Sequence, residues 1–238
     1  MTEVEVSAVI PVYNDRKALE RAIPCSIATL CDITDSFEVI VAEDGSTDGS
    51  TDYIRKWEGR DSHVRLLHSD ERQGRGKALN RAFSEAHGRI VLYYDVDLAT
   101  SMGHLRELVE AIREGADIAT GSRLMPASDI ERTAGREIAS RGYNLLARTI
   151  LGSRLCDHQC GFKAFNRQRL LALAPSVGAG HWFWDTEVLV RGQRANYVVK
   201  EFPVNWRSGP GTTVRFSDIF SMGSDILRLW WRLHVEKN

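Results

Sequence analysis

The first 120 residues alternate between short apolar runs and longer segments with helical spacing. Four runs rich in β-branched residues are VEVSAVI, FEVIVAE, HVRLLH and RIVLYYD, which begin at residues 4, 37, 63 and 89. Each run is followed by a segment in which apolar positions recur at helical spacing after polar capping residues. This order is typical of βαβ units, and it predicts an α/β fold with a mostly parallel central sheet flanked by helices.

The rhythm changes after residue 123. Helices are predicted over 133–155, 181–196 and 218–235, and a strand is predicted over 197–206. The apolar side chains expected on one side of the first of these helices are Ile138, Leu145, Leu146 and Ile150. The stretch 132–155 carries five arginines and a single glutamate. Such a basic amphipathic stretch indicates an anionic surface or ligand, although a solvated helix face explains the same pattern.

The last predicted helix contains Trp230 and Trp231. Tryptophan near a helix end occurs at membrane interfaces, but it belongs more often to a protein core. No apolar run approaches the ~20 residues needed to cross a bilayer. If the protein works on a membrane, we therefore expect it to work from the surface.

Composition narrows the class of protein. The 238 residues are 43% hydrophobic and 26% charged, which predicts one globular domain over 1–238. The formal charge of −1 gives no whole-molecule field for binding nucleic acid. The four cysteines match neither a zinc module nor a disulfide framework, and the N-terminus lacks the pattern of a signal peptide. We expect a cytoplasmic protein, peripheral at the cytoplasmic face of a membrane.

Asp95 and Asp97 directly follow the apolar run that ends at Tyr94. On a continuing strand their side chains would share one face and repel each other unless a cation lay between them. Hard divalent cations prefer one or two carboxylates together with phosphate oxygens and water. An isolated Asp-x-Asp is a weak signal, because short acidic pairs also cap loops. The pair predicts a site for Mg²⁺ or Mn²⁺ that a nucleotide diphosphate would complete.

The segment RQGRGKALN, residues 72–80, adds a candidate phosphate contact. Two glycines flank Arg75 and lead into Lys77 at a predicted helix start, where Lys77 and backbone amides can face phosphate. The spacing is not that of a P-loop, and no Gly-x-Gly-x-x-Gly follows the first strand. A dinucleotide site for hydride transfer is therefore disfavoured.

Several motifs in order resemble family 2 glycosyltransferases of the GT-A fold, a Rossmann-like architecture. They are AVIPVYND, FEVIVAEDGSTDGS, GRGKALNRAF and RIVLYYDVDLAT. Later segments are similar to those of enzymes that make polyprenyl-phosphate sugars, with dolichyl-phosphate glucosyltransferases nearest and mannosyltransferases next. These segments are GSRL, DHQCGFKAFNRQ, WFWDTEVLVRGQ and EFPVNW. The resemblance covers nearly the whole chain. It implies that 1–122 binds the nucleotide sugar, and that 123–238, with its C-terminal amphipathic helix, binds the acceptor.

The resemblance also assigns residues to the donor. It implies that Asp95 and Asp97 bind the metal, with Val96 beside the ribose. The other residues implied to bind the nucleotide sugar are Pro11, Tyr13, Asp15, Ala42, Asp44, Lys77, Arg123 and Arg207. Asp15 is a shorter acid than is usual in the family, and Ala99 stands where some mannosyltransferases have a third metal ligand. Arg207 and Arg215 are the cations available where those enzymes carry a lysine.

The acceptor implied by the resemblance is a lipid monophosphate. Candidates for its phosphate, or for lipid headgroups, are Arg132, Arg136, Arg141, Gln159 and Lys163. Asp185 lies where many family 2 enzymes carry a catalytic acid, and we assign it a positioning or weak base role, with a structural role as the alternative. His158 is interpreted as a surface or structural histidine, and Cys156 and Cys160 are interpreted as packed thiols.

These features predict a metal-dependent transferase that moves a sugar, glucose in the first instance, from UDP-glucose or a related donor to a polyprenyl or dolichyl phosphate. Because the family inverts, the product should be a β-linked sugar phosphate. Three alternatives remain open. They are a dolichyl-phosphate mannosyltransferase that uses GDP-mannose, a family 2 transferase with a soluble acceptor, and a nucleotide-binding regulatory module without catalysis.

Overall fold

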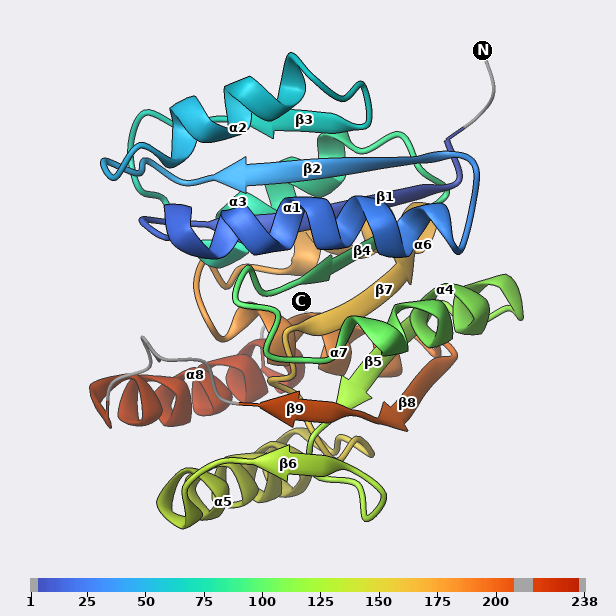
Figure 1. The fold of residues 1–238 in the computed structure, drawn as a ribbon. Coiled ribbons are helices and arrows are strands. Elements are labelled where there is room, and N and C mark those ends of the chain that lie inside the picture. Colours follow the sequence, from blue (N-terminus) through green and yellow to red (C-terminus); the bar gives the residue numbers. More distant parts are fainter. Residues whose placement is uncertain (1–3, 208–215, 236–238) are drawn as a thin grey trace.

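A computed structural model describes residues 4–207 and 216–235 (Figure 1). Within them the main sheet has seven strands in the order β3-β2-β1-β4-β7-β5-β8. Strand β7 runs antiparallel to both of its neighbours, β4 and β5, and the other pairings are parallel. The strands are β1 (Val6–Val12), β2 (Phe37–Glu43), β3 (Val64–Leu67), β4 (Ile90–Tyr94), β5 (Ile118–Ser122), β7 (Phe162–Asn166) and β8 (Val199–Pro203). The predicted mostly parallel sheet is confirmed.

Helices cover both faces of this sheet because its strands are buried on both sides. Along β1, Val6, Ala8 and Ile10 belong to one apolar cluster, and Val9 belongs to the other. The first cluster is covered by α1 (Arg16–Cys31), α2 (Ser50–Glu58) and α4 (Leu105–Arg113). The second is covered by α3 (Arg75–Glu85), α6 (Arg167–Leu173) and α7 (Trp184–Arg194). The short 3₁₀ turns are η1 (Met102–His104) and η2 (Ala174–Ser176).

A third apolar cluster joins α7 to α5 (Ala134–Leu151) and α8 (Phe216–His234). Figure 1 shows both of these helices outside the main sheet. On α5, Ile138, Leu145 and Leu146 are 71%, 59% and 48% exposed, so these apolar side chains lie outside the core. The helix instead buries Tyr143 and Ala147, whose partners are the side chains of α7 and α8.

The tryptophans of α8 are exposed, whereas a place in the core was favoured from the sequence over a membrane interface. Ile226 and Leu229 are fully buried, whereas Trp230 is 39% exposed and Trp231 is 55% exposed. The core of this small cluster is filled by one side of the helix, and the two indoles lie outside it. No helix within the described residues combines the length and apolar character needed to span a membrane.

The single strand predicted over 197–206 is two strands. Residues of β8 pair with β5 in the main sheet, and β9 (Asn205–Arg207) pairs with β6 (Asp129–Glu131) in a separate two-stranded sheet. Val204, between them, is 1% exposed, so the chain changes sheets at a buried residue. The small sheet lies next to the turn that carries Asp95 and Asp97, here called the aspartate turn, because the amide of Arg207 donates to the carbonyl of Ala99 (2.9 Å).

Candidate active site

The parallel strands β1, β2 and β4 end at one edge of the sheet (Figure 1). Ligands in open α/β sheets bind at this carboxyl edge. Because β4 ends at Tyr94, Asp95 and Asp97 lie in the turn that follows the strand. The amide of Leu98 donates to the carbonyl of Asp95 (3.0 Å), and the amide of Ala99 donates to Asp97 Oδ1 (3.0 Å). The turn still presents both carboxylates at the sheet edge.

Four charged side chains form a ladder that runs from the interior to this turn. Lys163 Nζ donates to Asp185 Oδ1 (2.9 Å), and Arg75 Nη1 donates to Asp185 Oδ2 (2.6 Å). The other end of the same guanidinium donates to Asp95 Oδ1 (2.8 Å). Tyr93 also donates its hydroxyl to Asp185. Arg75 thereby ties the candidate metal ligand to a buried carboxylate.

The inner end of the ladder, Lys163 and Asp185, is buried, and burial shifts the pKa of both groups. Lys163 is fully buried and the Asp185 side chain is 4% exposed. Burial raises the pKa of Asp185 to about 6, against the opposing effect of Arg75. Burial likewise lowers the pKa of Lys163 to about 8. Neither group is well solvated, so each depends on its partners, as buried charges generally do.

The two aspartates of the turn are close enough to affect each other. Loss of water around Asp97 raises the pKa of its carboxyl, and the neighbouring Asp95 carboxylate raises it further. Asp15 adds a smaller effect in the same direction. This local excess of negative charge is what a bound cation would relieve.

These carboxylates fit a hard divalent cation, for which oxygen ligands are preferred. Within the described residues no group of three or more His, Cys, Asp or Glu side chains is placed to hold a metal. A Mg²⁺ or Mn²⁺ ion here would be held by Asp95 and Asp97, and it would take its other ligands from phosphate and water. That requirement suits a site that binds its metal together with a nucleotide.

Gly161 sets the position of the Asp95 carboxylate. The amide of Asp95 donates to the Gly161 carbonyl (3.2 Å). A Cβ added to Gly161 would lie 2.0 Å from Asp95 Oδ2. Only a residue without a side chain lets the carboxylate lie this close to the backbone of the 152–161 loop.

A second loop holds Arg75 from the other side. The carbonyl of Gly180 accepts from the amides of Gly76 (3.0 Å) and Lys77 (3.3 Å) at the start of α3. Trp182 of this loop lies against Arg75, whose guanidinium carbon is 5.3 Å from the indole ring. A Cβ on Gly76 would come within 2.9 Å of the loop backbone, so the close approach requires glycine.

The predicted nucleotide residues gather at the same edge in different surroundings. Asp44 is 4% exposed and accepts the amides of Gln73 (2.9 Å) and Gly74 (2.8 Å), so it fixes the loop before α3. Asp15 caps α1 by accepting from the amide of Ala18 (3.2 Å). Pro11 and Ala42 lie in β1 and β2, and Val96 packs beside the first apolar cluster.

Tyr13 and Lys77 of that set are both exposed. The Tyr13 ring is 39% exposed, and the guanidinium carbon of Arg72 lies 4.0 Å from its centroid. Lys77 is exposed in the first turn of α3, and its side chain runs beside Gly180. The structure therefore pairs Arg75, and not Lys77, with the aspartate turn. The glycines on either side of Arg75 were the signal for this role.

Two arginines predicted to contact the donor form ion pairs with carboxylates of the protein. The Arg123 guanidinium pairs with buried Asp157 through Nε (2.7 Å) and Nη2 (3.0 Å). Arg207 pairs with Asp129 (2.6 Å) and Glu131 (3.1 Å) across the small sheet. Asp157, which holds Arg123, is buried, whereas Asp129 and Glu131, which hold Arg207, are exposed, and the contact of the two arginines with the diphosphate stays a prediction. Arg215 lies outside the described residues.

Lys163 corrects the acceptor assignment. It was expected to contact a lipid phosphate, but its fully buried ammonium lies beneath Asp185 in the ladder, so that expectation was wrong. The strand pattern explains the burial, because β7 lies between β4 and β5 and is covered on both faces. Gln159 lies in the loop before β7 and donates its amide to Asp157 Oδ1 (3.0 Å).

The remaining acceptor candidates are arginines near the start of α5. Arg132 is half-buried, and its Nε has no hydrogen-bond partner within the described residues. Burial lowers the pKa of Arg132, and the nearby Arg123 lowers it further. Arg136 is exposed, and Arg141 forms an ion pair with Glu137 one turn away (2.7 Å). Arg132 is thus a partly desolvated cation with donor capacity to spare.

His158 locks the loop that carries Gly161. It is fully buried, its Nδ1 lies 2.7 Å from Asn144 Oδ1, and its Nε2 lies 2.7 Å from Ser153 Oγ. Gln193 of α7 donates to the same serine oxygen (3.0 Å). Burial lowers the pKa of His158 to about 4. Of the surface and structural roles left open by the sequence, these contacts fit the structural one.

Known proteins are similar to this chain across most of its length. The model described as "Glycosyl transferase family 2" matches residues 7–171. Glycosyltransferase AglD of Haloferax volcanii is 50% identical over 236 residues, which cover 98% of this chain and 38% of that protein. The dolichyl-phosphate beta-glucosyltransferase of Saccharomyces cerevisiae is 28% identical, with 99% and 78% covered. The chain thus spans well under half the length of the first of these relatives.

Solved structures share the fold. Glucosyl-3-phosphoglycerate synthase from Mycobacterium tuberculosis, in complex with uridine diphosphate, superposes with a TM-score of 0.67 at 20% identity, covering 96% of this chain and 79% of that chain. The mannosyltransferase PcManGT from Pyrobaculum calidifontis, in complex with GDP-Man and Mn²⁺, gives 0.63 at 20% identity, with 98% and 65% covered.

The chain belongs to glycosyl transferase family 2, because the matched region covers more than half of it. The resemblance inferred from the motifs and the predicted GT-A fold are both confirmed, and with them the class of enzyme, a glycosyltransferase.

Substituting Gly161→Ala should displace the Asp95 carboxylate, because the added methyl group would overlap Asp95 Oδ2. We expect binding of Mn²⁺ together with UDP, measured by calorimetric titration, to weaken by roughly 10–100-fold, the usual cost of a misplaced site group. Gly223→Ala is the matched control, since its added Cβ meets no atom within 4 Å. Unchanged binding by Gly161→Ala would contradict this role of the glycine.

His158 should make folding sensitive to mild acid. The folded-state pKa lies below the ordinary 6.5, so stability is full above pH 6.5 and is lost as pH falls toward 4. Urea unfolding should show a loss of about 2 kcal/mol between pH 7 and pH 5. The His158→Gln variant should lack this part of the slope. Identical slopes for the two proteins would show that His158 is not buried as the neutral form.

Proposed function

We propose that the protein transfers a hexose, with glucose the first choice, from a nucleotide diphosphate sugar to a polyprenyl or dolichyl phosphate. The observation that carries the proposal is the buried ladder that ends in Asp95 beside Asp97. The similarity of the chain to dolichyl-phosphate beta-glucosyltransferases supports the choice of sugar and acceptor. The product would be β-linked, because inversion in one displacement is the behaviour expected of this family.

The donor half of the reaction needs a place for a departing diphosphate. A divalent ion held by Asp95 and Asp97 would neutralise the negative charge that develops on that group. The ladder supports this role because Arg75 restrains Asp95 before the donor arrives. Asp185 acts through Arg75 and is therefore a positioning residue, in line with one of the two roles expected from the sequence.

The acceptor half needs positioning more than proton transfer. A phosphate monoester has a second pKa of about 6, so it is mostly ionised near neutral pH and is already a nucleophile. Arginine guanidinium groups bind phosphate with two parallel hydrogen bonds. Arg132 supports this assignment, because its Nε is buried and has no partner within the described residues. Arg136 and Arg141 are proposed to attract lipid headgroups around it.

A membrane surface as the place of reaction is supported by the exposed side chains of α5 and α8. These apolar residues are Ile138, Leu145, Leu146, Leu227, Trp230, Trp231 and Val235, each at least 39% exposed. The two helices pack together through one apolar cluster, so the exposed residues belong to one structural unit. Arginines on α5 add the positive charge that attracts anionic lipids. We propose a peripheral position at the cytoplasmic face of a membrane.

The proposal is tested by incubating the purified protein with radiolabelled UDP-glucose, Mg²⁺ and a polyprenyl phosphate, followed by extraction into organic solvent. Labelled lipid should form and should disappear with excess chelator. Its amount should fall by at least about 100-fold in Asp97→Asn, because the substitution removes one of the two carboxylates proposed to hold the metal. GDP-mannose and a soluble sugar acceptor are the parallel arms.

The outcomes of that assay separate the candidates. Lipid labelled only from GDP-mannose would replace the donor, and label only in the aqueous phase would replace the acceptor. Equal turnover in the presence of chelator, or in Asp97→Asn, would overturn the proposed mechanism. Nucleotide binding without turnover in any arm would favour a regulatory module.

Arg132→Gln should raise the KM for polyprenyl phosphate by roughly 10-fold or more, the value of one charge-assisted hydrogen bond. The KM for the nucleotide sugar should stay unchanged, because Arg132 lies on the acceptor side. Arg148→Gln, which removes a charge from the exposed side of α5, is the control. Equal effects of the two substitutions would reduce Arg132 to a contributor of general positive charge.

A further inference from the structure

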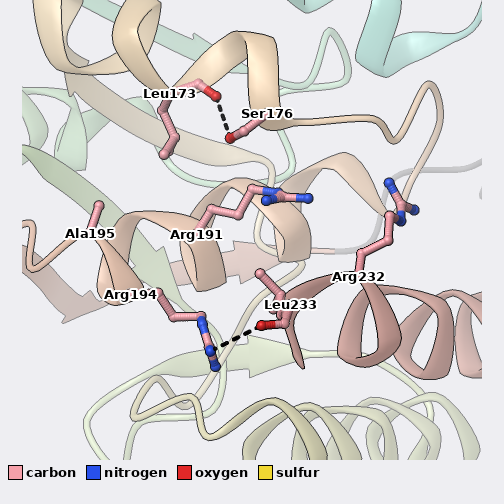
Figure 2. A pocket seen from close by; sticks show the side chains of 7 residues that line it. All are labelled: Leu173, Ser176, Arg191, Arg194, Ala195, Arg232 and Leu233. Carbon is pink, nitrogen blue, oxygen red and sulfur yellow. Dashed lines mark hydrogen bonds between the residues drawn. The ribbon is translucent and has the colours of Figure 1, made fainter. Parts of the chain in front are cut away.

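A recess of about 490 Å³ lies between α6, η2, α7 and α8, and the aspartate turn does not line it (Figure 2). Its lining residues are Leu173, Ser176, Arg191, Arg194, Ala195, Arg232 and Leu233. Asp185 lies in the first turn of α7 and Arg194 ends the helix, so nine residues, or about 14 Å of helix, separate these two side chains. The recess is therefore distinct from the catalytic edge.

Three guanidinium groups line this recess, and two of them lie near one carboxylate. Arg191 Nε donates to Glu187 Oε1 (2.8 Å), and Arg232 Nη1 lies 3.7 Å from the same oxygen. Glu187 itself is fully buried. Arg194 donates to the Leu233 carbonyl (3.5 Å), and no carboxylate within the described residues lies at ion-pair distance from it. The recess carries three positive charges against one negative charge.

Helix dipoles favour each of these arginines on its own helix. Cations in the last turn of a helix are favourable, and Arg191 and Arg194 lie in the last turn of α7, as Arg232 does in that of α8. Arg232 comes from a different helix, and Figure 2 shows it on the opposite side of the hollow from Arg194. Two helices thus contribute guanidinium groups to one concave surface, which is an arrangement that suits recognition of an anion.

The rest of the lining indicates the kind of anion. Leu173, Ala195 and Leu233 make much of the wall apolar, and Ser176 adds a hydroxyl. The volume is larger than an isolated phosphate needs. A phosphate group carried on an apolar or glyceryl body would use both the guanidinium forks and the apolar wall.

We propose that this recess is an accessory site for a phosphate group, distinct from the site of sugar transfer. Two sources share the chemistry: a phospholipid headgroup and a soluble phosphate ester. The neighbourhood favours the lipid, because Arg232 directly follows the exposed Trp231 on α8. A headgroup held here would anchor the end of α8 and fix the orientation of its exposed apolar side chains.

Glu187 gives the site a structural connection to the ladder. Its Oε2 accepts the amides of Gly178 (3.1 Å) and Ala179 (2.8 Å), in the loop whose Gly180 carbonyl holds the start of α3. An anion that draws Arg191 or Arg232 toward itself would change the partners of this carboxylate. Glu187 therefore links the arginines of the recess to the loop that holds Arg75.

The test compares binding of the full chain to vesicles without any sugar donor or acceptor. Vesicles of phosphatidylcholine alone and of phosphatidylcholine with phosphatidic acid are the lipid arms, and glycerol 3-phosphate is the soluble arm. Arg194→Gln and Arg232→Gln should each weaken binding to the acidic vesicles by about 10-fold or more, as expected for a specific phosphate contact. Arg228→Gln is the control, because Arg228 is exposed on α8 and does not line the recess.

Each result has a definite meaning. Arginine-dependent binding of glycerol 3-phosphate would assign the site to soluble esters, and arginine-dependent binding of acidic vesicles alone would assign it to lipid. Equal effects of Arg194→Gln and Arg228→Gln, or no effect of Arg194→Gln on either probe, would overturn the proposal. Circular dichroism checks the fold of Arg232→Gln, because this substitution removes a cation that lies near Glu187. Arg194→Gln keeps the test decisive if the Arg232→Gln variant unfolds. The outcome leaves the proposed transfer reaction untouched.

Discussion

The repulsion between two carboxylates in one turn is the constraint on which the arrangement of the site depends. Asp95 and Asp97 are held together by the end of β4, and each raises the cost of charge on the other. The protein meets part of that cost with Arg75, which pairs with Asp95 and with buried Asp185. A divalent cation would meet the rest. Much of the surrounding structure keeps Arg75 in place.

That support comes from both halves of the chain. Asp185 and Glu187 lie in the first turn of α7, two residues apart, and their side chains have different tasks. Asp185 anchors Arg75 directly, whereas Glu187 holds the 178–180 segment that packs against the start of α3. Gly161 and Gly76 permit backbone and side chains to approach where any Cβ would interfere. Donor and acceptor regions are therefore coupled through one helix and two glycines.

Period and motif order predicted the sheet, its helices and the aspartate pair, because burial on both faces leaves a clear apolar signature. Local spacing could not reveal which cation pairs with which acid. From the sequence, Lys163 and Arg123 were both expected to contact phosphate. In the structure they pair with the buried carboxylates of Asp185 and Asp157, and sequence spacing gave no sign of either pair. Arg75 was visible only as a residue between two glycines. The sequence left the surroundings of the exposed Ile138 and Trp231 open, because an apolar stripe looks the same whether a core or another surface covers it.

The ladder leaves few protein ligands for a metal, which makes cation binding depend on the nucleotide. Electron paramagnetic resonance of Mn²⁺, titrated with protein in the presence and absence of UDP, tests this dependence most directly. Mn²⁺ should bind weakly to the protein alone and at least about 10-fold more tightly with UDP, and Asp97→Asn should lose that gain. Equally tight binding without UDP, or an undiminished gain in Asp97→Asn, would contradict this dependence.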